Sequence, residues 1–532
     1  MATASPAFAS PSPIVRLTQG FDRPLDNAIA TARTCYSPRI VETSEVSASD
    51  RALALRDRLA AETYAAGHHT TLQHATFQFA IERVSRQLVW SLLHAHPFYN
   101  SEQASQRYVP VSKASLAIPA LAPDDDAIFR RAASRAMAAY ESLCEALLTP
   151  AEDAYFAIFP ARQAARDAWL PTIRKKAMEA ARYVLPVATF THLYHSISGL
   201  TLHRYARIAE RCDVPAEARL VIGAMVDAVQ QRDPDFFRHL GDPLPLEETP
   251  EFALLQSLAL GEADQIHDGA AAFAREFDDS LGGKVSILVD WKVNAPKALA
   301  DAVRTTLGLT RSTLSDEAAL EAVLSPAQNP LLAMPLRLGT LDKLTRALSH
   351  PHYTFRKKLS HSADSQDQRH RMTPGTRPRL ARQYAVGRPD FILPALIAQT
   401  PSARAFFEEE MAALFGAIDR LLDRGVPPSA ALYLLPNAFP IRFESSGELL
   451  HLHHKWTTRL CLTAQEEIWR ATRDEIAAVS DIHPDIARWI GPPCQLRQMA
   501  GIDPRCPEGP RFCGVAPWRL GPHGCQRLTR SI

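Results

Sequence analysis

LQHATFQFA at residues 72–80 and LSHPHYTFR at residues 348–356 follow one pattern, and that repetition decides how the chain folds. In each copy a leucine and a histidine precede two aromatic residues separated by one position, Phe77 and Phe79 in the first copy. Alternate side chains of a strand point to the same face, so this spacing predicts a strand with one buried face. Its presence in both halves of the chain predicts a duplicated domain.

Two further pairs of segments occur in the same order in both halves. An apolar stretch leading into an alanine-rich helical segment with Arg-Thr occupies residues 14–37 and 285–308, and each copy predicts a strand, a turn and a helix. The segments ARYVLP at 181–186 and ALYLLP at 431–436 each precede a predicted turn and amphipathic helix. Three collinear matches indicate a tandem duplication, with its boundary in the Pro- and Glu-rich stretch 241–252.

The length of 532 residues exceeds what one hydrophobic core supports, since cores stop growing at about 250 to 300 residues. We predict an α+β fold of two tandem domains, each a β-sheet flanked by helices. The first domain is expected at 14–245 and the second, more divergent one at 255–480. A disordered tail at 1–13 and a Cys-, Pro- and Gly-rich tail at 481–532 complete the predicted organisation.

The composition is that of an ordinary globular protein, with 46% hydrophobic and 22% charged residues and a formal net charge of +1. This balance gives no global reason to expect nucleic-acid or membrane binding. The sequence has no run of about 18 apolar residues, and its first residues lack the features of a signal peptide. Four cysteines, Cys35, Cys144, Cys212 and Cys461, are scattered singly, which is typical of reduced thiols. We therefore expect a cytoplasmic protein.

The other four cysteines lie close together in the C-terminal tail, at Cys494, Cys506, Cys513 and Cys525. The tail is too rich in proline and glycine to form an apolar core of its own, and a thiolate-bound zinc ion or iron–sulfur cluster would hold it together. The spacing lacks the Cys-x2-Cys pairs of the common zinc sites. Thiols without a metal are the alternative interpretation.

Several motifs of the chain are similar to those of flavin-dependent thymidylate synthases. Residues 67–70, Gly-His-His-Thr, resemble the family's Gly-His-x-Ser/Thr turn, and Gln-His-Ala at 73–75 resembles its Glu/Gln-His-Ala strand. Ser-Gln-Arg at 105–107 resembles the family's Ser-x-Arg, and ARYVLP at 181–186 resembles its A-R-x-V-L-P. Residues 459–468, RLCLTAQEEI, resemble the family's R-L-C-x-x-A-Q-W-E-I. The resemblance implies two domains of the thymidylate-synthase-complementing type.

Each half departs from the family where the other half keeps its pattern. The family's Arg-His-Arg is replaced by LHAHP at 93–97 in the first half but is present at 369–371 in the second. The second half lacks Ser-x-Arg, and a leucine replaces the arginine of A-R-x-V-L-P. The family's late arginine is Arg459 in the second half and Ala209 in the first. We therefore expect one composite site that uses residues of both halves.

The resemblance implies which residues bind which ligand at that site. A nucleotide monophosphate is dianionic near neutral pH, and arginine binds phosphate oxygens bidentately without losing its charge. The implied dUMP-binding residues are Ser105, Gln106, Arg107, Arg182, Gln366, Arg369 and Arg459. The implied FAD-binding residues are Thr70, Gln103, Arg369, His370 and Arg371. No covalent nucleophile is implied; Ser105 and Arg369 would position and polarise the bound molecules, and backbone N–H groups of the 105–107 loop would cradle the phosphate.

The implied reaction is the conversion of dUMP to dTMP, with methylenetetrahydrofolate as one-carbon donor, reduced FAD as hydride source and NADPH as reductant. Because the family's sites lie between subunits of a homotetramer, the resemblance also implies a homodimer of this two-domain chain. Two alternatives stay open. The motif losses fit a non-catalytic paralogue that binds a nucleotide or a flavin. Because arginines bind mainly the phosphate, the motifs also fit a related methyl or hydroxymethyl transferase that acts on another pyrimidine nucleotide.

Overall fold

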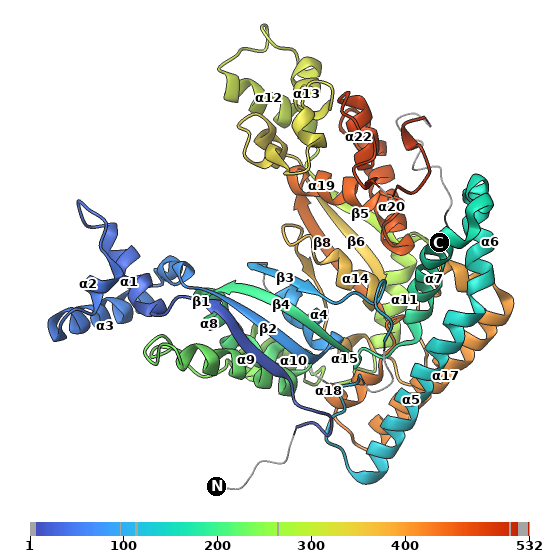
Figure 1. The fold of residues 1–532 in the computed structure, drawn as a ribbon, viewed down its shortest axis with the longest axis horizontal. Coiled ribbons are helices and arrows are strands. Elements are labelled where there is room, and N and C mark those ends of the chain that lie inside the picture. The colour runs from blue at the N-terminus through green and yellow to red at the C-terminus, as the bar shows by residue number, and fades with distance from the viewer. Residues whose placement is uncertain are drawn as a thin grey trace.

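Each half of the chain contains one four-stranded antiparallel sheet (Figure 1). The computed structural model describes residues 7–95, 97–111, 115–262, 265–509, 512–519, 530 and 532. The strand order is β1-β2-β4-β3 in the first sheet and β5-β6-β8-β7 in the second, so corresponding strands hold corresponding places. This correspondence confirms the predicted tandem duplication and the α+β class.

The strands account for little of the chain, and helices surround both sheets. The strands are β1 (Ile14–Gly20), β2 (Thr76–Ser85), β3 (Tyr99–Gln103), β4 (Phe190–Ser198), β5 (Ser286–Trp291), β6 (His352–Ser360), β7 (Gly375–Thr376) and β8 (Pro440–Glu448). The α-helices of the first half are α1 (Pro24–Thr34), α2 (Thr43–Val46), α3 (Asp50–Ala65), α4 (Arg86–Ala95), α5 (Pro123–Ala146), α6 (Leu148–Ile158), α7 (Arg166–Ala181), α8 (Gly199–Ile208), α9 (Pro215–Gln230) and α10 (Pro250–Ser257).

The second half and the tail contain further helices. Their α-helices are α11 (Ala270–Leu281), α12 (Ala295–Leu307), α13 (Asp316–Leu324), α14 (His361–Asp367), α15 (Leu380–Gln383), α16 (Ala395–Ala398), α17 (Pro401–Asp423), α18 (Pro428–Ala431), α19 (Leu449–Arg459), α20 (Glu466–Ile482), α21 (Pro484–Ala487) and α22 (Pro493–Met499). The 3-10 helices are η1 (His69–His74), η2 (Pro160–Ala165), η3 (Arg182–Val184), η4 (Ala209–Arg211), η5 (Leu246–Glu248), η6 (Pro330–Ala333), η7 (Leu338–Thr340), η8 (Thr345–Ser349), η9 (Leu432–Leu434) and η11 (Pro517–Arg519). Within the described ranges, none of these helices is both long and apolar enough to cross a membrane.

The predicted aromatic strands are β2 and β6, and Phe77 and Phe79 are fully buried on one face of β2. The predicted start of the first strand is wrong, because residues up to His74 belong to η1 and His74 itself is exposed. A long-range contact holds this stretch out of the sheet: the Asn27 side chain of α1 donates to the His74 carbonyl at 3.0 Å.

The prediction of a turn and a helix after each Tyr-x-Leu-Pro segment is incomplete, because a strand lies between them. In the first half this strand is β4, where buried and more exposed positions alternate. Two of its buried positions are the polar residues Thr191 and His195, which conceal the alternation in the sequence. Polar residues at core positions therefore hid a strand from the apolar pattern.

The two Tyr-x-Leu-Pro segments join the halves through reciprocal backbone hydrogen bonds. The N–H of Val187 donates to the Leu435 carbonyl at 2.8 Å. In the opposite direction, the N–H of Asn437 donates to the Leu185 carbonyl, also at 2.8 Å. The long helices α5 and α17 lie side by side (Figure 1), and both contact η3 and η9 at this junction. Because buried backbone groups rarely give up such partners, we expect the two halves to behave as one rigid unit.

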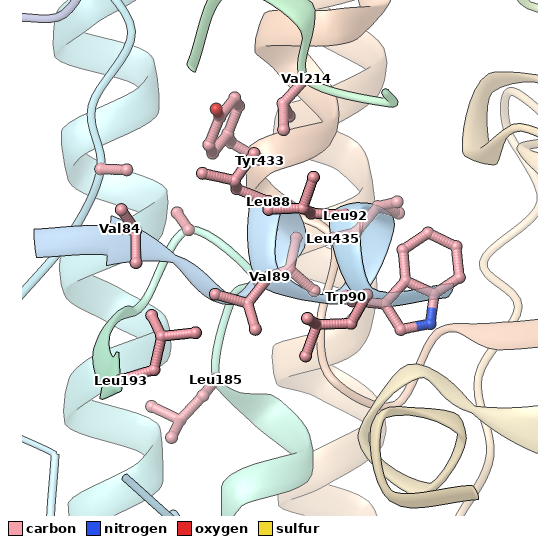
Figure 2. Packing of buried hydrophobic residues seen from close by; sticks show 14 of the residues in the cluster. Val84, Leu88, Val89, Trp90, Leu92, Leu185, Leu193, Val214, Tyr433 and Leu435 are labelled. Carbon is pink, nitrogen blue, oxygen red and sulfur yellow. The ribbon is translucent and has the colours of Figure 1, made fainter. Parts of the chain in front are cut away.

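The main hydrophobic core is shared between the halves. Figure 2 shows α4 at its centre, with Leu88 and Leu92 near Leu435 of the second half and Val89 nearer to Leu185 of the first. All of these side chains are at most 5% exposed. A core that crosses the junction fixes the position of first-half residues relative to second-half residues, which is what a composite site needs.

Two buried glutamates repeat one arrangement across the junction. Glu217 accepts hydrogen bonds from the backbone N–H and hydroxyl of Ser85 at 2.7 and 2.6 Å, and from the Tyr433 hydroxyl of the other half at 2.6 Å. Glu467 makes the same contacts with the serine of its own half and with Tyr183, whose hydroxyl lies at 2.5 Å. Each carboxylate thus ties a strand end of one half to a tyrosine of the other.

Candidate active site

Arg107 reaches from the first half to the second. It lies in the loop that follows β3, and its side chain is 15% exposed. Its Nε donates to Glu179 Oε2 at 2.5 Å, and its Nη2 donates to the Thr463 carbonyl of the second half at 2.8 Å. The guanidinium is therefore held at the junction between the halves.

Arg182 and Gln106 lie beside it and are each 4% exposed. Asn437 of the second half donates at 3.0 Å both to Gln106 Oε1 and to the Arg182 carbonyl, which fixes these two residues relative to each other. Among the described residues, the buried Nε and Nη2 of Arg182 and the Nε2 of Gln106 have no hydrogen-bond partner. Buried donors without partners cost about 1 to 3 kcal/mol each, so these groups favour a ligand that accepts from them.

Second-half residues complete the cluster. Arg459, the last residue of α19, donates through Nη2 to the Gln366 carbonyl at 2.7 Å. The Gln366 side chain donates in turn to Gln465 Oε1 at 2.5 Å, and Gln465 donates to the Tyr183 hydroxyl of the first half. A chain of hydrogen bonds therefore connects Arg459 and Gln366 with the residue that follows Arg182.

The charges in this cluster are unbalanced. Burial lowers the pKa of Arg459 to about 10, and the positive charges of Arg107 and Arg369 contribute to this shift. Burial also lowers the pKa of Arg182, and the positive charge of Arg107 lowers it further. Although burial opposes its ionisation, Arg107 and other neighbouring cations hold the pKa of Glu179 at about 2. Asp367 opposes the shift of Arg459, but it is itself paired with Lys455 at 2.7 Å, so the acidic groups do not fully neutralise these arginines and the site suits an anion.

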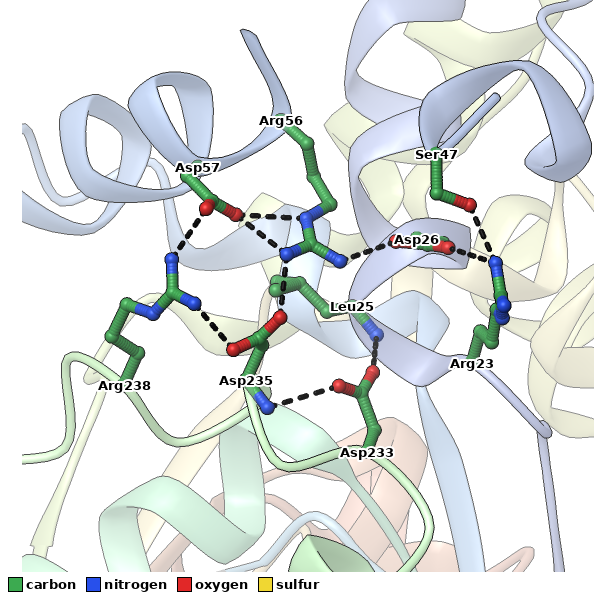
Figure 3. A network of polar contacts seen from close by, with 9 residues as sticks. All are labelled: Arg23, Leu25, Asp26, Ser47, Arg56, Asp57, Asp233, Asp235 and Arg238. Carbon is green, nitrogen blue, oxygen red and sulfur yellow. Dashed lines mark hydrogen bonds and ion pairs between the residues drawn. The ribbon is translucent and has the colours of Figure 1, made fainter. Parts of the chain in front are cut away.

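A second buried arginine shows how this fold satisfies such a group when no ligand is involved. Arg56 of α3 is 7% exposed, and Figure 3 shows it between Asp26, Asp57 and Asp235. Its nitrogens lie 2.6 to 3.0 Å from these three carboxylates. Although burial opposes the charge, these hydrogen bonds raise the pKa of Arg56. Arg182 differs because its buried Nε and Nη2 have no such partners among the described residues.

Arg369 and Arg371 lie against β3 of the first half. Arg369 Nη2 donates to the Ser101 carbonyl at 2.7 Å and to Glu102 Oε2 at 3.1 Å. Arg371 lies over the Tyr99 ring, with its guanidinium carbon 5.1 Å from the ring centre. The Glu102 side chain is 87% exposed, so its ion pair with Arg369 adds little stability. Both guanidinium groups retain capacity for an anionic group.

His370 lies between these arginines in the sequence and packs near His454, with ring centres 5.8 Å apart. Burial, together with the positive charges of Arg459 and Lys455, holds the pKa of His370 well below its usual value. A neutral imidazole can pack against an aromatic ring without adding charge. Gln103, the last residue of β3, pairs with Leu193 of β4 and precedes the Arg107 loop.

The backbone of the Ser105 loop differs from the expected phosphate cradle. The Arg107 N–H donates to the Ser105 hydroxyl at 3.3 Å, and the Tyr108 N–H donates to the Ser105 carbonyl at 3.1 Å. These donors are used within the turn itself. The turn thus uses one N–H of the 105–107 loop, that of Arg107, and the nearby guanidinium groups are further donors for an anion.

Thr70 lies on η1, where it is exposed. η1 packs against α8, and the Thr201 hydroxyl of α8 donates to the Phe98 carbonyl at 3.2 Å. Arg371 donates at 3.3 Å to the carbonyl of the neighbouring Pro97. Thr70 therefore lies at the same end of the first sheet as the loop that Arg371 contacts.

A cavity of about 470 Å³ opens beside Arg107, and the sequence motifs do not predict it. Its walls combine aromatic side chains such as Tyr155 and Trp169 with cationic ones such as Lys176, and Phe512 of the tail closes one side. Burial lowers the pKa of Lys176 to about 8. The volume lies within the range of about 300 to 1,000 Å³ typical of small-molecule sites.

Glu466 lines another, smaller cavity together with Lys176 and Glu179, and it predicts how the stability of the protein changes with pH. Burial raises the pKa of Glu466 from 4.5 to about 7, although the nearby Arg470 opposes this. Between these pH values the folded state holds a proton that the unfolded chain releases, so stability falls as pH rises and the loss is complete above about pH 7. The Glu466→Gln variant is expected to lack this decrease in the free energy of unfolding, which is on the order of 3 kcal/mol in wild type.

Urea unfolding of wild type and Glu466→Gln between about pH 5 and pH 8 measures the effect. Glu408→Gln is the matched control, because Glu408 also pairs with an arginine four residues away but is 43% exposed. Parallel stability curves for Glu466→Gln and wild type would contradict the prediction.

The cysteines of the tail are arranged differently from the expectation. Cys525 lies outside the described residues, whereas Cys494, Cys506 and Cys513 line one small cavity together with Cys461. Cys461 was predicted to be an isolated thiol, but the tail folds back onto the loop that follows α19. Burial, and to a smaller extent the Cys461 thiol, raises the pKa of Cys506 and of Cys513. In the described part of the chain, no three His, Cys, Asp or Glu side chains converge tightly enough to bind one metal ion.

Sequence comparisons identify relatives of both halves. The family model described as thymidylate synthase complementing protein matches residues 16–235 and again 288–485. The flavin-dependent thymidylate synthase of Clostridium tetani is 29% identical over 245 residues, which cover 45% of this chain and 91% of that protein. The enzyme of the same name from Geobacter sulfurreducens is 31% identical over 173 residues, or 32% of this chain and 71% of that protein.

Among solved structures, the UMP/dUMP methylase PolB from Streptomyces cacaoi, bound with 5-Br UMP, aligns with 45% of this chain and 100% of its own. Its sequence identity is 19% and the TM-score is 0.31. The family model matches each of the two halves that carry corresponding sheets. The chain therefore belongs to the thymidylate synthase complementing protein family, as a tandem duplication of the family domain.

Proposed function

We propose that this chain is a flavin-dependent thymidylate synthase that converts dUMP to dTMP at one site built from both halves. The family membership supports the reaction class. The observation that carries the proposal is the meeting of Arg107 and Arg182 of the first half with Arg459 and Gln366 of the second, in a single chain. Each half alone lacks the residues that the other contributes.

The proposed role of the arginine cluster is to bind and orient the dUMP phosphate. Arg182 offers two buried nitrogens, Nε and Nη2, and Arg459 offers a buried Nε; none of the three has a hydrogen-bond partner among the described residues. A phosphate that accepts from these donors would satisfy them and balance the excess positive charge. Gln366 would hold the uracil or ribose by neutral hydrogen bonds, and Gln106 would add a hydrogen bond through its Nε2. Ser105 would keep the turn that carries Arg107 in place.

The residues around β3 fit the FAD that the family implies. Arg369 and Arg371 provide positive charge, and the carboxylate that Arg369 contacts, Glu102, is exposed; this arrangement suits a diphosphate. His370 is held neutral, so it can pack on an uncharged ring, while Gln103 and Thr70 lie at the edges of this region. When bound, FAD supplies the hydride that NADPH provides, and methylenetetrahydrofolate supplies the one-carbon unit. The protein's own part is to position the reactants and to preorganise charge.

The activity test uses the purified full chain with FAD, NADPH, methylenetetrahydrofolate and dUMP, and follows dTMP formation. Parallel reactions contain UMP or dCMP in place of dUMP. A protein that binds dUMP or flavin without turnover would be the non-catalytic paralogue. Faster methylation of UMP or dCMP would indicate the related transferase instead.

Two tyrosines that occupy equivalent places in the halves test the composite site. Tyr183→Phe and Tyr433→Phe each remove a hydroxyl from a buried glutamate and are each expected to lower the free energy of unfolding by about 1 to 3 kcal/mol. Only Tyr183 also accepts from Gln465, which holds Gln366. We therefore expect only Tyr183→Phe to weaken dUMP binding as well.

Urea unfolding and dUMP titration of the two variants measure these effects, and Tyr433→Phe serves as the matched control. Equal loss of dUMP affinity in both variants would show that the effect is a general one of stability. Unchanged affinity in Tyr183→Phe would exclude the Gln465–Gln366 link from the site.

A further inference from the structure

The proposed reaction does not use the cavity of about 470 Å³ beside Arg107. Three separate parts of the chain form its walls: helices α6 and α7, the loop at residues 462–463, and tail residues such as Phe512 and Arg530. The tail lies beyond the second match to the family model, which ends at residue 485. Of the residues implied to bind dUMP, Arg107 alone lines this cavity. The cavity is therefore a feature of this chain's own arrangement, next to the arginine cluster but distinct from it.

Aromatic side chains form one wall of the cavity. The ring centre of Tyr155 lies 4.8 Å from that of Phe159 and 6.1 Å from that of Trp169. The guanidinium carbon of Arg162 lies 4.4 Å from the centre of the Phe159 ring and 4.0 Å from that of Trp169. Arg162 also donates to the Tyr155 hydroxyl at 2.6 Å and to the Phe512 carbonyl of the tail at 3.0 Å. Because Arg162 holds the rings and the tail together, the aromatic wall is already in place for a flat molecule.

A group of cations forms another part of the lining. Burial lowers the pKa of Lys176 to about 8, and although Glu179 opposes this, the positive charges of Arg530 and Arg107 add to it. These side chains therefore lie close together. Glu179 is the acidic member of the described lining, and it already pairs with Arg107 at 2.5 Å. Lys176 and Arg530 remain as two positive charges that the lining itself does not balance.

Arg530 also has a buried donor without a partner. The residue is 8% exposed, and its Nε and Nη2 donate to the main-chain oxygen of Ile532 at 3.1 and 2.9 Å. Nη2 donates as well to the Ala464 carbonyl at 3.0 Å, whereas Nη1 has no hydrogen-bond partner in the part of the chain that the structure describes. The nearby Glu466 is paired with Arg470. Since an unpaired buried donor is costly, Arg530 favours a ligand that accepts from Nη1.

We propose that this cavity binds an aromatic phosphate ester such as a nucleoside monophosphate. The flat ring packs against Trp169 and Phe159, as bases stack on aromatic side chains in nucleotide-binding proteins. The phosphate accepts from Lys176 and Arg530. A phosphate monoester carries about −1.5 to −2 charges at pH 7, which matches these two cations, whereas a carboxylate would balance only one of them. Because Phe512 and Arg530 belong to the tail, the bound ligand also holds the tail against the first half.

Isothermal titration of the full chain with AMP tests this site. AMP is the probe because it is not the proposed substrate, and excess FAD keeps it out of the flavin region. Adenosine and inorganic phosphate each carry one part of the ligand and are titrated in parallel. We expect AMP to bind at least about 10-fold more tightly than either, since each of them lacks one set of contacts.

Variants of the lining assign the binding to this cavity. Lys176→Met is expected to weaken AMP binding by about 10- to 100-fold and to leave adenosine binding unchanged, because it removes a charged donor to the phosphate. Lys176→Arg keeps the charge and should keep most of the affinity. Trp169→Leu is expected to weaken AMP and adenosine alike, by about 5- to 100-fold. Lys284→Met is the matched control, because Lys284 is an exposed lysine of the second half.

Arg182→Met separates the cavity from the arginine cluster, and we expect its AMP affinity to equal that of wild type. AMP binding that is lost in Arg182→Met and kept in Lys176→Met would overturn the proposal, because the nucleotide would then occupy the arginine cluster. Wild type that binds AMP no more tightly than adenosine or phosphate would overturn it too, even where a variant fails to fold. AMP titration does not depend on dTMP formation, so failure of this site and failure of the proposed function are distinguishable.

Discussion

Replacing Arg182 with methionine is expected to weaken dUMP binding by about 2 to 5 kcal/mol while making the ligand-free protein more stable. The loss of affinity corresponds to roughly 30-fold to several thousand-fold in Kd. The gain in stability follows because Arg182 is 4% exposed and two of its nitrogens, Nε and Nη2, lack partners among the described residues. Methionine fills a similar volume and removes this cost, which we expect to stabilise the protein by about 1 to 3 kcal/mol.

The matched control is Arg56→Met, which replaces the other buried arginine discussed above. Because Arg56 is paired with Asp26, Asp57 and Asp235, its loss leaves the buried Asp26 with only the longer contact to Arg23 at 3.4 Å, and it is expected to destabilise the protein. Its dUMP affinity should stay that of wild type. Urea unfolding without ligand and dUMP titration measure both quantities. Arg182→Met that is less stable than wild type would show that Arg182 serves the fold and not a ligand.

The parts of the fold that the sequence predicted are those with a local or repeated signal. Phe77 and Phe79 alternate on a single strand, so their burial follows from the period of the strand. The meeting of Arg107 with second-half residues was predictable because each half lost what the other kept. The roles of these residues stay predictions. The strand β4 was missed because Thr191 and His195 occupy buried positions that the apolar pattern does not mark.

The remaining site features depend on contacts between distant segments that carry no motif. Asn437 orients Gln106 only because the two Tyr-x-Leu-Pro segments pair across the junction. The aromatic cavity forms where α6 and α7 contact the tail, and no residue pattern predicts that contact. Cys461 lies beside the tail cysteines because the tail folds back onto the loop after α19, and this contact between distant segments depends on the tertiary fold. Patterns in a single sequence show local periodicity but not contacts between segments that are distant in the sequence.

Arg107→Ala and Arg459→Ala are each expected to abolish most dTMP synthesis, and mixing the two inactive proteins is expected not to restore it. Each arginine would make charge-assisted hydrogen bonds to the phosphate, so each loss costs about 2 to 5 kcal/mol of dUMP affinity. The two residues belong to different halves, but the structure brings them together within one chain. Every chain of a mixed population therefore carries one damaged site.

Restoration of activity in the mixture would show the opposite geometry. If Arg107 of one chain met Arg459 of another, a mixed dimer would contain one site with both lesions and one with neither. Subunits should be exchanged under mild denaturation, and dTMP formation compared with that of each variant treated alone. Arg211→Ala is the matched control, because Arg211 is exposed and lies beside Ala209, the first-half counterpart of Arg459. We expect Arg211→Ala to keep full dTMP synthesis, which would show that the loss of activity is specific to the arginines at the junction. If Arg211→Ala loses activity too, removing any arginine damages the protein in general.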